Sequence, residues 1–142
     1  MKFLGVDFGT KRVGVAISDE GGSIAFPFKV LKNDRDFFDT FLSMVKEENI
    51  ERVIVGESLD SSGAPNKVNV LIKEFIEKLK EQNISVETQK EFFSSFEAHD
   101  RQGKESLNAR KTTFSKTEEL DSKAASVILQ RYLEKINLNK NI

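Results

Sequence analysis

The sequence predicts an α/β fold in which one five-stranded mixed sheet carries helices on both of its faces. Three short apolar runs separated by turn sequences open the chain, which is typical of consecutive antiparallel strands. Two further β-branched runs follow, each preceded by a segment whose apolar residues recur at helical spacing. Because parallel strands need long crossover connections, these helices predict that the last two strands lie parallel.

The first three strands are expected at Lys2–Phe8, Val13–Ser18 and Ser23–Leu31. Residues 9–12 join the first strand to the second, and residues 19–22 join the second to the third. Both joining segments contain glycine, which favours tight turns. Pro27 has no N–H to donate to a neighbouring strand, so it marks a bulge or an exposed edge.

The next two segments predict a helix and then a strand. Asn33 or Asp34 is the expected N-cap of the helix, because both side chains can accept a hydrogen bond from its first turn. The apolar positions of the helix are Phe37, Phe38, Phe41, Leu42 and Val45. The β-branched run Arg52–Glu57 then predicts the fourth strand, and the loop Ser58–Pro65 follows it.

A second helix and the fifth strand are expected after this loop. The helix begins at about Asn66, and its apolar stripe consists of Val68, Leu71, Ile72, Phe75, Ile76 and Leu79. The strand is Ile84–Glu91, with Ile84, Val86 and Thr88 on one face.

The last third of the chain is less regular until its final helix. Ser94–Glu97 fits a capping box for a short helix, and residues 101–116 predict a mobile loop because they show no sustained periodicity. The final helix is expected to have Thr117 as its N-cap and an apolar face of Ala124, Ala125, Ile128, Tyr132 and Ile136. No internal repeat or linker divides the chain, so residues 1–142 are expected to form a single domain.

Composition excludes several classes of site. The chain has no Cys, which excludes thiol catalysis and Cys-type zinc sites, and one His, which excludes a multi-His metal site within the chain. The formal net charge is −1, from 22 Lys and Arg against 23 Asp and Glu. An argument for nucleic-acid binding must therefore rest on local patches rather than on overall charge.

Neither a membrane span nor a signal peptide is expected. The longest stretch without a charged residue is the eight residues Gly21–Phe28, whereas a spanning helix needs about 20. The N-terminal run contains Asp7 and has no small-residue cleavage site, so a cytoplasmic location is expected.

Three carboxylates stand at positions where a charge needs a partner. Asp7 interrupts an apolar strand on the face of Phe3 and Gly5, and Glu91 closes the fifth strand. Asp121 precedes Ala125 by one turn and so belongs to the apolar stripe of the last helix. Each also has an ordinary interpretation: Asp7 as a turn acid, Glu91 as a solvated acid, and Asp121 as an acid favoured by the helix dipole.

The combination of these carboxylates is more specific than any one of them. Strand ends form the usual ligand crevice of open α/β sheets, so the three groups are expected to converge there. Carboxylate oxygens select hard cations, which predicts Mg²⁺ or Mn²⁺ as the cofactor. Two such ions about 3.5–4 Å apart are the usual apparatus for hydrolysing phosphodiester bonds.

A series of segments begins with Asp7-Phe8-Gly9-Thr10-Lys11-Arg12-Val13-Gly14-Val15-Ala16 and continues through Val55-Gly56, the loop 59–63 and the block around Glu91. These segments resemble the YqgF family, bacterial nucleases that are similar to Holliday junction resolvases. The resemblance covers nearly the whole chain. It is strongest in the last helix, at Leu120–Ala125 and Ile128–Leu133. It implies an RNase H-like fold, a role in maturing the precursor of 16S ribosomal RNA, and a metal-binding triad of Asp7, Glu91 and Asp121.

Two departures from the family pattern bear on the site. The Asp and Arg that usually flank the strand-five Glu are absent around Glu91, which puts substrate contact there in doubt. Glu57 stands where the family has an apolar residue after the central glycine. Because related resolvases place an acid on the central strand, Glu57 is either a fourth ligand or a solvated loop acid.

Four cations are candidate substrate-binding residues. Lys11 and Arg12 follow Asp7 closely, and Arg110 and Lys111 belong to a locally basic stretch before the last helix. Cations placed in this way can hold backbone phosphates. The alternatives are support of the turn for the first pair and a solvated loop for the second.

The leading hypothesis is a metal-dependent nuclease acting on structured nucleic acid, with the 16S ribosomal RNA precursor as substrate. The alternatives are a DNA endonuclease that cuts junctions and a catalytically weak module that binds RNA or the ribosome. Asp7-Phe8-Gly9-Thr10 also resembles the phosphate-binding turn of actin-like ATPases, but those need two such domains around one nucleotide. A monomer would suit RNA trimming, whereas a homodimer would suit a junction.

Overall fold

The computed structural model describes residues 2–58, 67–91 and 116–140. Its elements follow the expected order of three strands, then helix, strand, helix, strand and helix. The elements are β1 Lys2–Phe8, β2 Arg12–Ser18, β3 Ala25–Lys32, α1 Phe37–Glu47, β4 Ile50–Ser58, α2 Lys67–Glu81, β5 Ser85–Glu91 and α4 Lys116–Lys140. The predicted short helix at Ser94–Glu97 and nearly all of the predicted loop 101–116 lie outside the described residues.

One mixed sheet with the strand order β3-β2-β1-β4-β5 forms the centre of the molecule. β1, β2 and β3 are antiparallel neighbours, whereas β4 is parallel to both β1 and β5. The predicted fold class is therefore confirmed. Pro27 combines both expected features, because it lies on the edge strand β3 at a shift in the β2–β3 register.

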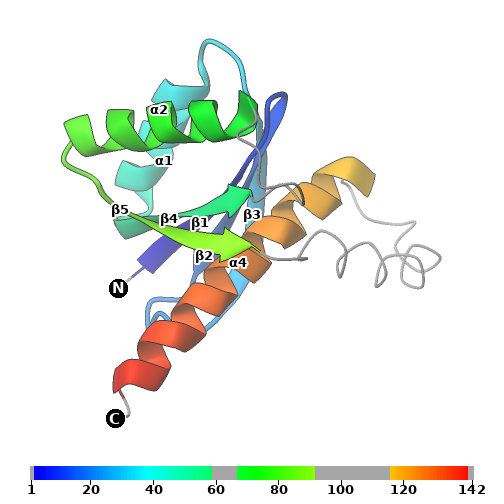
Figure 1. The fold of residues 1–142 in the computed structure, drawn as a ribbon. Helices are drawn as coiled ribbons and strands as arrows, with labels where there is room; N and C mark the ends of the chain where they lie inside the picture. The colour runs from blue at the N-terminus through cyan, green and yellow to red at the C-terminus, as the bar shows by residue number, and fades with distance from the viewer. Residues whose placement is uncertain (1, 59–66, 92–115, 141–142) are drawn as a thin grey trace.

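One face of the sheet is covered by α1 and α2, which lie together on one side in Figure 1. Leu4, Val6 and Phe8 of β1 point into this layer and are buried. An aromatic cluster fills it: Phe8, Phe37, Phe41 and Phe75 have neighbouring ring centroids 5.2 to 5.9 Å apart. The apolar stripes predicted for the two helices thus form the larger core.

The long helix α4 crosses the opposite face of the sheet, as Figure 1 shows. Its buried hydrophobic residues pack on Phe3, Ala16 and Ile54: they are Ala125, Ile128, Leu129, Tyr132 and Leu133. The Phe3 and Tyr132 rings meet edge to face with centroids 6.1 Å apart. Because residues of a strand alternate between faces, this second core fixes the side of the sheet on which Asp7 lies.

Two predicted helix starts are wrong in detail. Asp36, rather than Asn33 or Asp34, occupies the N-cap position of α1, and its side chain makes no capping hydrogen bond. Asn33 instead bonds the turn between β1 and β2, donating from Nδ2 to the Gly9 carbonyl at 2.8 Å. α4 begins at Lys116, so Thr117 lies within the helix and Lys116 does not belong to the preceding loop.

No helix among the described residues is long and apolar enough to cross a membrane.

Candidate nuclease site

Asp7 lies near the end of β1 on the face that α4 covers. It follows Phe3 and Gly5 in the strand alternation, and its side chain is half-buried. Gly14 of β2 is its direct partner across the antiparallel pair. On the other side, Val6 pairs with Val55, so the next residue along β4 beside Asp7 is Gly56. The Asp7 carboxylate therefore projects from the sheet between two residues that have no side chain.

The strand register also brings the end of β5 to the edge of the sheet at which β1 ends, near Asp7. β1, β4 and β5 are parallel, so their carboxyl ends lie together, and we call this the carboxyl end of the sheet. Gln89 pairs with Gly56, and Glu91 pairs with Ser58 two residues further along. Strand spacing of about 4.8 Å and a rise of about 3.3 Å per residue put the Glu91 Cα on the order of 12 Å from the Asp7 Cα.

Strand alternation also assigns faces to the acidic positions. Ile54 belongs to the α4 layer, and its β5 partner Glu87 lies on the same face. Glu91, four residues after Glu87, occupies a backbone position on this face as well. Glu57, by contrast, follows Val53 and Val55 on the face of α1 and α2. This separation from Asp7 gives no support to Glu57 as a fourth ligand.

Close contact at Gly5 determines how α4 lies over Asp7. A Cβ atom on Gly5 would stand 2.6 Å from the Leu129 Cβ and 2.9 Å from the Ala125 carbonyl oxygen. Phe3 meets Tyr132, one turn further along α4, so the helix runs antiparallel to β1. Continuing this progression from Phe3 through Gly5 to Asp7 leads to the turn of α4 that contains Asp121 and the buried Ser122.

The side chains of Glu91 and Asp121 lie outside the described part of the structure, so only the backbone positions of these two residues can be related to Asp7. Among the described side chains, no group of three His, Asp or Glu residues is arranged to hold a metal ion. Gln89 is a candidate site residue that the sequence did not indicate. It pairs with Gly56, the residue beside Asp7, and only this register brings it to the site.

The predicted substrate-binding cations divide into two groups. Lys11 and Arg12 are exposed at the turn between β1 and β2, directly after the strand that carries Asp7. The turn is tight, because a Cβ on Gly9 would come 2.5 Å from the Arg12 carbonyl oxygen. Arg110 and Lys111 lie outside the described residues.

A polar network fixes α4 to β4 on the same face. An Arg52 guanidinium nitrogen donates to the Tyr132 hydroxyl at 2.7 Å and lies 3.5 Å from a Glu87 carboxylate oxygen. Burial and a hydrogen bond to Glu87 raise the pKa of Tyr132 above its ordinary value, although Arg52 opposes the shift. The bond to Tyr132 also raises the pKa of Arg52, which therefore keeps its charge.

Because of this network, we expect the free energy of unfolding to fall at alkaline pH. The folded state favours neutral Tyr132. The contribution of Tyr132 to stability is therefore complete below pH 10, the ordinary tyrosine pKa, and is lost as pH rises through the higher folded-state pKa.

We expect Tyr132→Phe to lower the free energy of unfolding by about 1 kcal/mol at neutral pH, and its free energy of unfolding to fall less at alkaline pH than that of the wild type. Tyr132 is the single tyrosine of the chain, so tyrosinate absorbance follows this titration directly. A midpoint equal in the folded and urea-unfolded protein would contradict the account.

The chain has relatives along almost its full length. Residues 1–135 match a family model described as RuvX, Holliday junction resolvase. A Nitratidesulfovibrio vulgaris protein named "Putative pre-16S rRNA nuclease" is 39% identical over 136 residues, which cover 94% of this chain and 93% of that protein. A Sulfurihydrogenibium protein of the same name is 33% identical over 141 residues, covering 97% and 93%.

Solved structures confirm the RNase H-like fold. The T. thermophilus RuvC in complex with Holliday junction substrate superposes with a TM-score of 0.58 at 14% identity, covering 94% of both chains. The Fowlpox virus resolvase in complex with Holliday junction DNA gives a TM-score of 0.61 at 16% identity, covering 96% of this chain and 99% of that one.

Proposed function

Because the chain belongs to the RuvX family of Holliday junction resolvase-like nucleases, we propose that it is a metal-dependent nuclease of structured RNA that processes the 16S ribosomal RNA precursor. The observation that supports this most is the position of Asp7. It is half-buried at the carboxyl end of the sheet, between Gly14 and Gly56, and on the face covered by α4. Neither residue beside Asp7 on the adjacent strands has a side chain, so the carboxylate is the functional group at this point of the sheet that could hold a metal ion against a phosphate group.

Asp7, Glu91 and Asp121 are the proposed ligands of Mg²⁺ or Mn²⁺. Their oxygens are the donors that these ions prefer, and the neighbours of Asp7 on the two adjacent strands, Gly14 and Gly56, carry no side chain that could compete for its carboxylate. When bound, such ions supply an activated water and stabilise charge on the leaving oxygen.

The chain's own residues have three proposed roles beyond metal binding. Lys11 and Arg12 hold phosphates of the cleaved strand, because they are exposed at the turn that follows Asp7. Arg110 and Lys111 are also proposed to hold phosphates of the substrate, because they belong to a locally basic stretch of the sequence. The close contact of α4 with Gly5 sets the position of the Asp121 turn relative to Asp7.

We propose ribosomal RNA, rather than branched DNA, as the substrate. The relatives at 39% and 33% identity bear the name of a pre-16S rRNA nuclease, whereas the resolvases in complex with junctions share 14% and 16% identity and indicate the fold alone. Cleavage of a DNA junction is the second candidate, because the matching family is described by that activity. The proposed setting is the cytoplasm, as a monomer on RNA or a homodimer on a junction.

The experiment that tests this proposal compares two labelled substrates side by side, a 16S precursor fragment and a four-way DNA junction. Purified protein with Mn²⁺ is expected to cut the RNA within or beside a paired region and to leave the junction intact. Samples with a chelator are the control, and no cleavage is expected in them. Cleavage of the junction alone would favour the second candidate. RNA binding without cleavage, in the presence of metal, would favour the catalytically weak binding module.

A further inference from the structure

An exposed aromatic ring lies on β3, the strand at one edge of the sheet. Phe26 is 48% exposed, and Ile24, two residues earlier, is 52% exposed. Phe26 pairs with Ile17 of β2, which packs against the core beneath α1 and α2, so its ring is on that face of the sheet. The two helices lie closest to β4 and β5, towards the other edge. They therefore leave Phe26 uncovered.

A cation lies next to this ring on the same face. Lys29 pairs with Val15, which is two residues from Ile17, and its side chain is exposed. Its ammonium group lies 5.2 Å from the centroid of the half-buried Phe28 ring, which is a cation–π contact. Because Phe28 packs against the core, this contact helps to position Lys29. We call Phe26, Phe28 and Lys29 the edge patch.

The sequence of β3 disfavours pairing of this edge with a strand of another protein. Pro27 has no N–H to donate, and the register with β2 shifts beside it. Prolines, bulges and lysines are the features with which natural edge strands prevent strand addition, and β3 has all three. Strand addition therefore does not explain why Phe26 is exposed.

The charges on and beside β3 favour an anionic ligand. The strand contains two lysines and no acidic residue. In the turn before it, Asp19 accepts two backbone N–H groups at 2.7 and 3.0 Å, and Glu20 has an interaction of its own. A ligand with negative charge and flat apolar surfaces would contact both Lys29 and Phe26. Unpaired nucleic acid has this chemistry, because its phosphates bind cations and its bases stack on aromatic rings.

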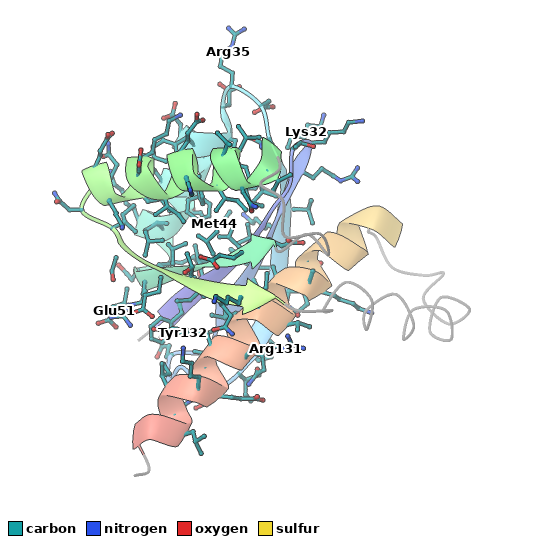
Figure 2. The ribbon with its side chains drawn as sticks, in the orientation of Figure 1. Lys32, Arg35, Met44, Glu51, Arg131 and Tyr132 are labelled. Atoms are coloured by element: carbon teal, nitrogen blue, oxygen red, sulfur yellow. The ribbon has the colours of Figure 1, made fainter. Side chains whose placement is uncertain are left out.

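β3 connects the edge patch with the carboxyl end of the sheet. Through the register of β2, Lys29 is level with the residue before Asp7. Two strand spacings and the rise along the strand put the Lys29 Cα on the order of 10 Å, and the Phe26 Cα on the order of 14 Å, from the Asp7 Cα. Lys32 ends the strand, and Figure 2 shows it next to the turn between β1 and β2. Since β3 is an edge strand, an RNA strand can pass around it from the face of Asp7 to the face of Phe26.

We propose that the edge patch binds an unpaired stretch of RNA that continues from the cleaved bond; this inference rests on the proposed nuclease function. One base stacks on the Phe26 ring, and Lys29 holds a backbone phosphate beside it. A double-stranded stem does not fit this role, because neighbouring base pairs cover the faces of its bases. Stacking is tolerant of sequence, since every base has a flat π face, so no base preference is expected.

Binding to an unpaired RNA and to an RNA hairpin of equal length, over a range of salt concentrations and without metal, tests this inference. Phe26→Ala is expected to weaken binding of the unpaired RNA by about 5-fold to 100-fold, because the stacked base loses its platform. Phe26→Leu is expected to lose most of this affinity although it keeps an apolar side chain, whereas Phe26→Trp keeps the affinity. Lys29→Gln is expected to weaken binding about twofold to fivefold and to lower the salt slope by about 0.7. Hairpin binding is expected to change less.

Two control variants match these substitutions, and a crosslink locates the contact. Val70→Ala shortens an apolar side chain that is 55% exposed on α2, and Lys73→Gln removes an exposed cation from the same helix. Neither is expected to change RNA binding. Unpaired RNA that carries 5-iodouridine is expected to crosslink to Phe26 on irradiation, which mass spectrometry of the digested protein detects. The melting temperature of each variant shows whether it is folded.

The outcomes separate the inference from the proposed function. Binding of unpaired RNA that is unchanged in Phe26→Ala and Phe26→Leu, in a protein that still cuts RNA, would overturn the inference and leave the nuclease proposal standing. Full affinity in Phe26→Leu would overturn the stacking role. A wild-type dimer that Phe26→Ala dissociates, with RNA binding unchanged, would overturn the inference in favour of a second copy of the chain on the edge patch. A wild-type protein that neither binds nor cuts either RNA would overturn the proposed function, and the inference with it.

Discussion

Asp7→Asn is expected to lower the rate of RNA cleavage at saturating Mn²⁺ by at least about 100-fold, because even partners of metal ligands contribute 10- to 100-fold. The substitution keeps the shape of the side chain and removes its charge. Because the half-buried Asp7 side chain has interactions of its own, the substitution also affects the free energy of unfolding, and this effect is measured separately from the rate. Single-turnover cleavage and thermal unfolding of the same preparation measure the two effects.

Glu74→Gln is the matched control for this substitution. Glu74 is exposed on α2, on the opposite side of the sheet, and the change is of the same kind. It is expected to affect neither cleavage nor unfolding by a measurable amount. Asp7→Asn that cuts as fast as the Glu74→Gln protein would remove Asp7 from the proposed ligand set.

Gly5→Ala is expected to destabilise the protein by about 1–3 kcal/mol and to reduce cleavage beyond what unfolding explains. The new Cβ would meet the Leu129 Cβ at 2.6 Å and the Ala125 carbonyl oxygen at 2.9 Å. Because the second of these atoms is helix backbone, the strain is relieved only by moving α4 away from β1. That movement also shifts Asp121 relative to Asp7. Urea unfolding, together with cleavage measured well below the melting temperature, separates the two losses.

Gly21→Ala provides the comparison for a glycine without such contact. A Cβ at Gly21 would have the Asp19 carboxylate at 3.5 Å as its nearest neighbour, which is ordinary van der Waals contact. We expect a stability change within about 0.5 kcal/mol and unchanged cleavage. If Gly5→Ala behaved like Gly21→Ala, the packing of α4 on β1 would not control the site.

The sequence predicted those features that depend on local periodicity. Alternation along β1 was sufficient to assign Asp7 to the face of Phe3 and Gly5, and helical spacing predicted the buried stripe from Ala125 to Tyr132. The N-cap of α1 was predicted wrongly because Asn33 is engaged elsewhere. Its side chain bonds the Gly9 carbonyl, which is 24 residues away and belongs to another element.

Features that depend on register could not be predicted from the sequence. Gly14 and Gly56 belong to segments that resemble the family, but their position on either side of Asp7 follows only from the pairing of β1 with β2 and β4. The bond between Arg52 and Tyr132 joins residues 80 positions apart, and the face of the sheet on which Phe26 lies follows from the β2–β3 register. Each requires knowing which strands are neighbours.

The most direct test of the proposed site is a crystal structure of the wild-type protein soaked with Mn²⁺, with anomalous scattering used to locate the ion. The account expects an anomalous peak at the carboxyl end of the sheet, bonded to carboxylate oxygens of Asp7, Glu91 and Asp121, and no such peak in Asp7→Asn crystals. A strong peak elsewhere, with these three carboxylates pointing apart, would contradict it.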